Sequence, residues 1–133
     1  MNELLVDIYS FGYIRSGIPA DESGNKGGFV FDCRFLLNPG AHTRFMFMTG
    51  LDNDVRAFLA QQDATQEFLV RIIGIIDEVV ASYTSLGYTH LHVAFGCTGG
   101  QHRSVYCAEK LAAHLREMNV RCSVTHTEKK YWP

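Results

Sequence analysis

The sequence predicts one α/β domain over residues 1–133, with a mostly parallel sheet and helices packed on it. Strand-like and helical segments alternate along the chain, which is typical of a parallel sheet. A glycine-rich turn joins a strand to a helix in the C-terminal part. The 133 residues, 47% hydrophobic and 20% charged, suffice for one core and lack the polarity of a disordered chain.

Two strands and a long loop are predicted in the N-terminal part. Residues 4–11 alternate apolar and mixed side chains, and residues 29–34 form a short apolar run, so both segments favour strands. The intervening residues 12–28 contain a proline and several glycines, which predicts a loop. The length of this loop favours a function or mobility. Asn38-Pro39-Gly40, after the second strand, is a turn signal.

Two helices are expected in the middle of the chain. A short helix over residues 52–61 would begin with Asp52 as its N-cap. A longer helix over residues 65–86 would end at Gly87, because glycine accepts the left-handed conformation of a helix C-terminus. Apolar residues at helical spacing are expected to form its buried stripe: Phe68, Ile72, Ile75, Ile76, Val79, Val80 and Tyr83.

The C-terminal part is predicted to form a strand–helix–strand unit. Its strands lie over residues 91–95 and 120–125, and its helix begins near His102. Such a unit should have a right-handed connection and parallel strands. The helix is expected to direct these residues inward: Val105, Ala108, Leu111, Ala112, Leu115 and Met118.

The turn before this helix has the composition of an anion-binding loop. Residues 96–104 read Gly-Cys-Thr-Gly-Gly-Gln-His-Arg-Ser. A strand that stops at glycines, followed by a helix, leaves unpaired N–H groups in one concavity, and the helix dipole adds positive charge there. Gly99 and Gly100 allow positive φ and close approach of a ligand, and Arg103 offers a planar fork that suits phosphate. We therefore predict a phosphate-binding strand–loop–helix near the C-terminus; the alternative is an ordinary turn with solvated side chains.

The same loop contains the pattern Cys-x5-Arg-Ser, which runs from Cys97 to Arg103 and Ser104. It resembles the phosphate loop of cysteine-dependent phosphatases, in which a thiolate at a helix N-terminus attacks phosphorus. Gly96 stands where those phosphatases usually carry His, and no recognisable aspartic-acid loop supplies an acid for the leaving group. A phosphatase with Cys97 and Arg103 as catalytic residues is the alternative to a binding domain.

Several other polar residues are candidates for function. Asp32 and Arg34 share one face of a strand before a turn, a placement that fits either a pocket rim or an edge-strand charge. His102 beside the loop is expected to bind phosphate rather than to act as an acid or base. His90 and His92 share a strand face, but without a suitably spaced third ligand their expected role is packing or hydrogen bonding. The sequence predicts neither a metal nor a cofactor.

The charge distribution bears on partners and location. Residues 1–96 carry six Lys/Arg and eleven Asp/Glu, a net −5, whereas residues 97–133 carry six and three, a net +3. The basic, aromatic C-terminal segment with Arg121, Lys129 and Lys130 is compatible with RNA contact, although a solvated surface is the simpler interpretation of the composition. Met1-Asn2-Glu3 lacks the basic start of a signal peptide, no apolar run could span a membrane, and the four cysteines form no CxxC pair. A cytoplasmic protein with reduced thiols and no membrane contact is expected.

Three ordered motifs carry a resemblance to a known family. They are Phe-Asp-Cys-Arg-Phe-Leu-Leu-Asn-Pro over residues 31–39, Thr-Gly-Leu-Asp over residues 49–52, and the glycine-rich loop over residues 96–105. With shorter matches at residues 11–19 and 126–130, they resemble the C-terminal domain of the RNase adapter protein RapZ and its nucleotide-binding relatives. The resemblance extends over nearly the whole chain.

The resemblance implies a regulatory domain that senses a phosphorylated small molecule. In RapZ this domain binds small regulatory RNA and senses the amino sugar phosphate glucosamine-6-phosphate, so RNA or protein is a further candidate partner here, and a homo-oligomer stays open. Such proteins typically carry an N-terminal Walker-type ATP- or GTP-binding domain, but no G-x-x-x-x-G-K-[ST] motif occurs in these residues, so nucleotide hydrolysis is not carried over. The chain departs from the family at Gly40, where a large residue is common.

By similarity, Asp32 and the loop from Thr98 to Arg103 map onto the sugar-phosphate pocket. The complete set of predicted ligand-binding residues is Asp32, Arg34, Asn38, Cys97, Thr98, Gly99, Gly100, His102, Arg103 and Ser104.

Overall fold

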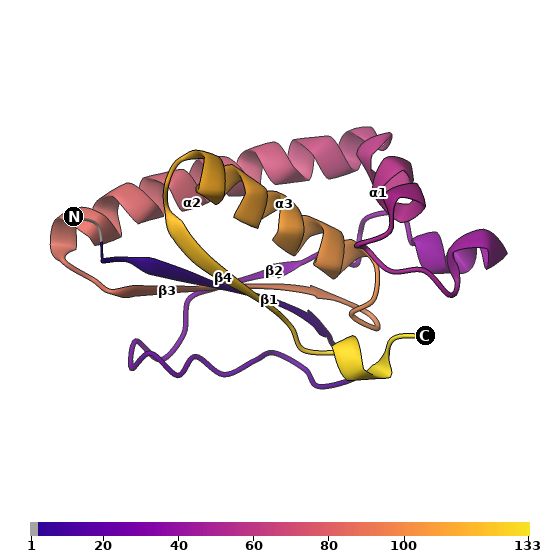
Figure 1. The fold of residues 1–133 in the computed structure, drawn as a ribbon, viewed down its shortest axis with the longest axis horizontal. Coiled ribbons are helices and arrows are strands. Elements are labelled where there is room, and N and C mark those ends of the chain that lie inside the picture. Colours follow the sequence, from indigo (N-terminus) through magenta and orange to yellow (C-terminus); the bar gives the residue numbers. More distant parts are fainter. Residues whose placement is uncertain (1–2) are drawn as a thin grey trace.

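The computed structural model describes residues 3–133 and contains one four-stranded sheet in the order β2-β3-β1-β4 (Figure 1). The strands are β1 (Leu5–Gly12), β2 (Phe29–Asp32), β3 (His90–Cys97) and β4 (Arg121–His126). Each adjacent pair is parallel, which confirms the predicted sheet type. Met1 and Asn2, on which the expectation of no leader partly depends, lie outside the described residues.

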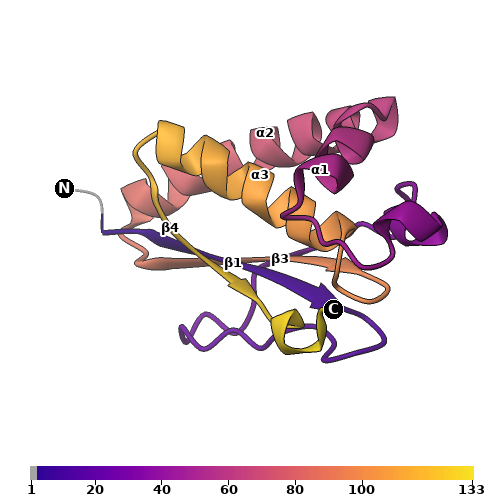
Figure 2. The same ribbon diagram turned by 45° about the vertical axis from the view of Figure 1, so that its right-hand side comes forward.

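The three α-helices lie on one face of this sheet, and a coil crosses the other face (Figure 2). The helices are α1 (Asn53–Ala60), α2 (Asp63–Leu86) and α3 (Arg103–Glu117), and the single-turn 3-10 helices are η1 (Pro39–Ala41), η2 (Thr43–Phe45) and η3 (Lys129–Tyr131). The predicted α/β architecture is therefore confirmed. Gly87 ends α2 with a φ of 82°, as the sequence predicted.

The direction of each connection explains this distribution over the two faces. The β2-to-β3 and β3-to-β4 connections run the same way across the sheet, whereas the β1-to-β2 connection runs the opposite way. Parallel crossovers are almost always right-handed, so opposite directions place the connections on opposite faces. The chain therefore diverges at the carboxyl ends of β1 and β3, which are neighbours, and a divergence of this kind leaves a crevice suited to a ligand.

Alternation along the central strands divides the sheet into an apolar and a polar face. Buried apolar residues of β1 and β3 pack against the helices: Val6, Ile8, Leu91, Val93 and Phe95. The opposite face carries His90, whose Nδ1 lies 2.9 Å from Asp7 Oδ2, and His92, whose ring centroid lies 4.9 Å from that of Tyr9. The hydrogen-bonding and packing roles predicted for the two histidines are confirmed.

The predicted apolar stripe of α2 was partly wrong. Its fully buried positions recur every three or four residues and are Thr65, Leu69, Ile72, Ile76 and Val80. Ile75 is 43% exposed because it is one residue, or about 100° of helix rotation, away from the buried Ile76. Met118, predicted to point inward from α3, is exposed because it follows the last turn of the helix.

Asp52 occupies the N-cap position of α1, but its side chain does not cap the helix. Its Oδ2 accepts a hydrogen bond from the backbone N–H of Thr49 at 2.7 Å, so the carboxylate closes the preceding turn instead.

β2 is also shorter than predicted. It ends at Asp32 because the Asp32 carboxylate accepts from the Arg34 N–H at 2.9 Å and bends the chain away from the sheet.

The difference between the two neighbouring isoleucines of α2 gives a stability prediction. Ile76→Ala should lower the free energy of unfolding by about 2–5 kcal/mol, because it opens a cavity at a fully buried site. Ile75→Ala should cost about 1 kcal/mol or less, because that side chain already contacts solvent. Urea denaturation of both variants measures the difference, and equal losses would show that α2 packs through another face.

Candidate functional site

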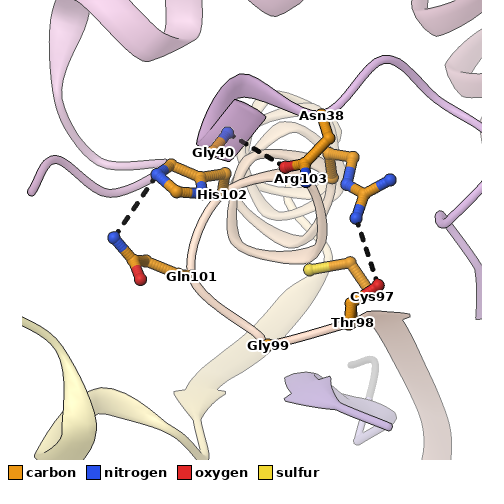
Figure 3. Close-up of a pocket in the computed structure, with 8 residues that line it drawn as sticks. All are labelled: Asn38, Gly40, Cys97, Thr98, Gly99, Gln101, His102 and Arg103. Carbon is orange, nitrogen blue, oxygen red and sulfur yellow. Dashed lines mark hydrogen bonds between the residues drawn. The ribbon is translucent and has the colours of Figure 1, made fainter. Parts of the chain in front are cut away.

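A cavity of about 180 Å³ lies at the carboxyl end of β3, beside the first turn of α3. Figure 3 looks toward the N-terminal end of α3 and shows the lining side chains arranged around it. The wall has two sources, the glycine-rich loop after β3 and the η1 segment after β2. The lining residues are Asn38, Gly40, Cys97, Thr98, Gly99, Gln101, His102 and Arg103.

The backbone of the glycine-rich loop supplies hydrogen-bond donors. Within residues 3–133, the N–H groups of residues 98–105 have no protein acceptor. Gly100 uses the conformational freedom of glycine, with a φ of 74°, whereas Gly99 does not adopt a positive φ. A Cβ at Gly99 would meet no atom within 4 Å, which shows that this backbone borders open space. The loop can therefore present N–H groups to an anion at a helix N-terminus.

Arg103 is 5% exposed, and most of its donors are engaged by protein atoms. Its Nη1 donates to the carbonyl oxygens of Arg34 at 2.8 Å and Leu36 at 3.0 Å, while Nη2 lies 3.5 Å from Thr98 Oγ1. Its Nε has no hydrogen-bond partner in the part of the chain that the structure describes. The side chain therefore fastens the segment after β2 to the loop after β3, in addition to placing a positive charge at the cavity.

His102 is held as a neutral imidazole. Its Nε2 lies 2.9 Å from the carbonyl oxygen of Phe45, and a carbonyl only accepts, so Nε2 carries the proton. Burial lowers the pKa of His102, although the backbone groups of Phe45 and Met48 and the charge of Asp52 oppose this and Arg103 adds to it. Nδ1 is then an acceptor, with no partner within residues 3–133. In this state His102 cannot donate to phosphate, so that part of its predicted role is not supported by the tautomer.

Gln101, which no sequence pattern singled out, closes the other side of the cavity. Its Nε2 donates to the carbonyl oxygens of Met46 at 3.0 Å and Met48 at 2.7 Å. Its backbone carbonyl accepts from the N–H of Gly50 at 2.9 Å. These contacts join the turn before α1 to the glycine-rich loop, so the loop is held at both of its ends.

Cys97 and Ser104 contact each other beneath the loop. The Cys97 Sγ lies 3.1 Å from the Ser104 Oγ, and both residues are buried. The thiol lines the cavity, whereas Ser104 lies behind it. The lining residues of the described chain include no carboxylate, so none of them supplies the leaving-group acid that a phosphatase would need.

A second missed residue, Glu128, is fully buried behind the loop. Its Oε2 accepts from the N–H groups of Gly12 at 2.9 Å and Ser16 at 3.0 Å, and its Oε1 accepts from the Ser16 hydroxyl at 2.8 Å. Burial alone would raise the pKa of Glu128, but these hydrogen bonds outweigh it and lower the pKa below its ordinary value. The side chain is therefore a fully bonded carboxylate rather than a free acid.

Comparison with known proteins identifies the family. The chain matches the model of the RapZ C-terminal domain over residues 4–130. It belongs to the RapZ C-terminal domain family. It is 40% identical to a nucleotide-binding protein of Rhodospirillum rubrum over 131 residues. This aligned stretch is 98% of this chain and 39% of that protein. It is 42% identical over 124 residues to a nucleotide-binding protein of Methylobacillus flagellatus, covering 93% of this chain and 42% of that protein.

The chain thus spans less than half the length of these curated relatives. The same holds for a nucleotide-binding protein of Geobacter sulfurreducens, which is 37% identical and of which the chain covers 42%. No helix within residues 3–133 has the length and apolar character to cross a bilayer. In the same residues, no three His, Cys, Asp or Glu side chains gather in a way that could hold a metal ion.

In this RapZ C-terminal domain, Asp32 and Arg34 lie outside the cavity lining. They form a two-point ion pair, with the Arg34 Nη2 2.6 Å from Asp32 Oδ2 and the guanidinium 3.8 Å above the Tyr13 ring. Hydrogen bonds from Arg34 lower the pKa of Asp32, and the charge of Arg103 contributes. Asp32 is in register with Gly96, which precedes the cavity-lining Cys97, so its backbone lies near this end of the sheet, and a rim role for the pair stays a prediction.

The residues predicted to contact RNA are not brought together. Arg121 begins β4, whereas Lys129 and Lys130 follow its carboxyl end in η3. At about 3.3 Å per strand residue, the length of β4 separates them by about 20 Å. The RNA contact therefore stays a prediction, with its cations divided between the two ends of the strand.

The hydrogen bond from His102 to Phe45 gives a spectroscopic prediction. Long-range ¹H–¹⁵N NMR should find His102 as the Nε2–H tautomer at pH 7, with a pKa below the ordinary value of 6.5. Because the folded pKa is depressed, His102 contributes stability that is present above pH 6.5 and is lost as pH falls through the lower folded pKa. His102→Gln should remove this component from the pH dependence of unfolding. An Nδ1–H tautomer, or a raised pKa, would contradict the assigned contact.

Proposed function

We propose that this domain binds a phosphate-bearing metabolite, of the sugar-phosphate class, and acts as a sensing domain within a regulatory protein. The observation that carries the proposal is a set of unpaired backbone N–H groups on loop residues that line the cavity at the N-terminus of α3, namely Thr98, Gly99, Gln101, His102 and Arg103. Donors fixed in this way, together with the helix dipole, favour an anion. Family membership supports a binding role in general terms.

The charge of the lining supports an anion over a cation. Arg103 brings a positive charge to the cavity, and the described lining contains no carboxylate to balance it. The carbonyl oxygens of Arg34 and Leu36 hold the guanidinium in place without neutralising it. A phosphoryl group therefore gains a fixed cation and backbone donors without displacing an internal ion pair.

The size of the cavity limits which part of the ligand enters. A volume of about 180 Å³ is below the range of about 300–1,000 Å³ that encloses a whole drug-sized ligand. We infer that the phosphoryl group occupies the cavity and that the sugar extends toward the rim. The Asp32 carboxylate there can accept hydrogen bonds from sugar hydroxyl groups or an ammonium group. Comparing glucosamine-6-phosphate with glucose-6-phosphate measures the contribution of the amine.

Gly99→Ala provides a direct test. The added methyl group meets no protein atom within 4 Å and needs no positive φ, so the fold should be retained while the methyl group enters the ligand space. We expect affinity for glucose-6-phosphate, measured by calorimetry, to fall by about 1–3 kcal/mol, the usual cost of a surplus methyl group in a packed site.

Gly74→Ala is the matched control. It also adds a methyl group into open space, but within α2, where alanine should stabilise the helix by about 0.5–1 kcal/mol. This variant should keep the wild-type affinity. Unchanged binding in Gly99→Ala, with binding present in the wild type, would place the phosphate elsewhere.

Cys97→Ser separates binding from catalysis. Because the lining lacks a carboxylate, we expect the wild type to bind phosphate monoesters without hydrolysing p-nitrophenyl phosphate above background, and Cys97→Ser to retain binding. Chromogenic assay of both proteins gives the answer. Hydrolysis by the wild type that Cys97→Ser abolishes would establish the thiol as a nucleophile and replace the binding proposal with the phosphatase.

A further inference from the structure

We infer that the C-terminal segment of residues 127–132 positions the anion loop through Glu128 and Trp132, so that order in this segment is coupled to occupancy of the cavity. The inference rests on the proposed function for its ligand. The contacts themselves do not depend on it.

The first link is close packing between Glu128 and the loop. A Cβ at Gly100 would lie 2.5 Å from the Glu128 Cγ and 2.7 Å from the Gly12 nitrogen, so no space separates these three residues. The Glu128 carboxylate is in turn fixed by the N–H of Gly12 and by Ser16. Gly100 therefore cannot move toward the C-terminal segment without displacing a buried, fully bonded side chain.

The second link fixes the orientation of one donor. The Trp132 Nε1–H donates to the carbonyl oxygen of Gly100 at 3.1 Å. This carbonyl shares a rigid peptide plane with the N–H of Gln101, and all peptide bonds of the described chain are trans. The C=O and N–H of a trans peptide point in opposite directions, so Trp132 directs the Gln101 N–H away from itself. Gln101 lines the cavity, and its N–H has no protein partner within residues 3–133.

Trp132 itself packs against a partly buried histidine that is bonded to two further elements. Its ring centroid lies 5.5 Å from that of His126. The His126 Nδ1 lies 2.6 Å from the Ser10 Oγ, and its Nε2 lies 2.7 Å from the Glu109 Oε2 on α3. The tryptophan therefore packs against β4 through His126, which is itself bonded to β1 and α3.

Coupling of this kind acts in both directions. If Trp132 holds the loop in its binding conformation, an anion that binds this conformation must stabilise the contact to Trp132 by the same factor. The segment also carries Lys129, Lys130 and Tyr131, which is 54% exposed. Occupancy of the cavity would then be expressed as order in a cationic and aromatic surface.

Trp132→Phe tests the link without ligand. The variant keeps an aromatic ring, although a smaller one, that can still pack against His126, while the donor to Gly100 is lost. We expect the Gln101 amide resonance to shift and amide hydrogen exchange at residues 98–102 to accelerate. Tyr131→Phe is the control, because it changes the neighbouring aromatic residue and leaves the bond to Gly100 intact. Unchanged Gln101 resonance and exchange in Trp132→Phe would overturn the inference, whatever the ligand does.

A titration with glucose-6-phosphate tests the coupling. Calorimetry should find affinity about three- to tenfold weaker in Trp132→Phe, the effect of losing one neutral hydrogen bond, and unchanged in Tyr131→Phe. The chain contains one tryptophan, so its fluorescence in the wild type should change as the cavity fills. Equal affinities in the three proteins would overturn the coupling. A wild type that binds no phosphate ester, with the loop altered in Trp132→Phe, would refute the proposed function and support the positioning role.

Discussion

The carboxyl ends of β1 and β3 approach so closely that neither Gly12 nor Gly100 can carry a side chain. A Cβ at Gly12 would lie 2.6 Å from the carbonyl carbon of Gly99. This contact lets the loop after β1 run against the glycine-rich loop, with the Tyr13 N–H donating to the Cys97 carbonyl at 2.9 Å. It also turns the Gly12 N–H toward Glu128. The cavity, the buried carboxylate and the C-terminal segment all depend on this approach of two backbones.

The negative net charge of the chain does not extend to the cavity. The chain carries −2 overall, yet the acids near the site are already engaged. Asp32 is paired with Arg34, and Glu128 is saturated by backbone and hydroxyl donors on the far side of the loop. Glu128 keeps its negative charge because its donors are neutral, but it lies behind the loop and is not among the residues that line the cavity, where Arg103 is the charged side chain. The proposed anion site therefore rests on where the charges are placed and not on the composition of the chain.

Sequence patterns predicted the features that depend on local order. Alternation identified the strands, helical periodicity identified α2 and α3, and glycine chemistry located the loop before α3. The residues that sequence reasoning missed depend on contacts between distant segments. Glu128 resembles an ordinary surface acid until the fold places it under Gly12, and Gln101 acquires its role only through carbonyl groups near residue 47. The choice between Ile75 and Ile76 likewise required the actual rotation of α2 against the sheet.

Arg103 shows how structure and recognition can share one side chain. A carboxylate partner would hold a buried guanidinium firmly but would also cancel its charge. Here the partners are the carbonyl oxygens of Arg34 and Leu36, which fix its orientation through dipoles alone. The positive charge is therefore held in place without a ligand, so the proposed binding of a phosphoryl group would need little reorganisation of this side chain. The same bonds hold the segment after β2 against the loop, so the wall of the cavity and its charge are made by one residue.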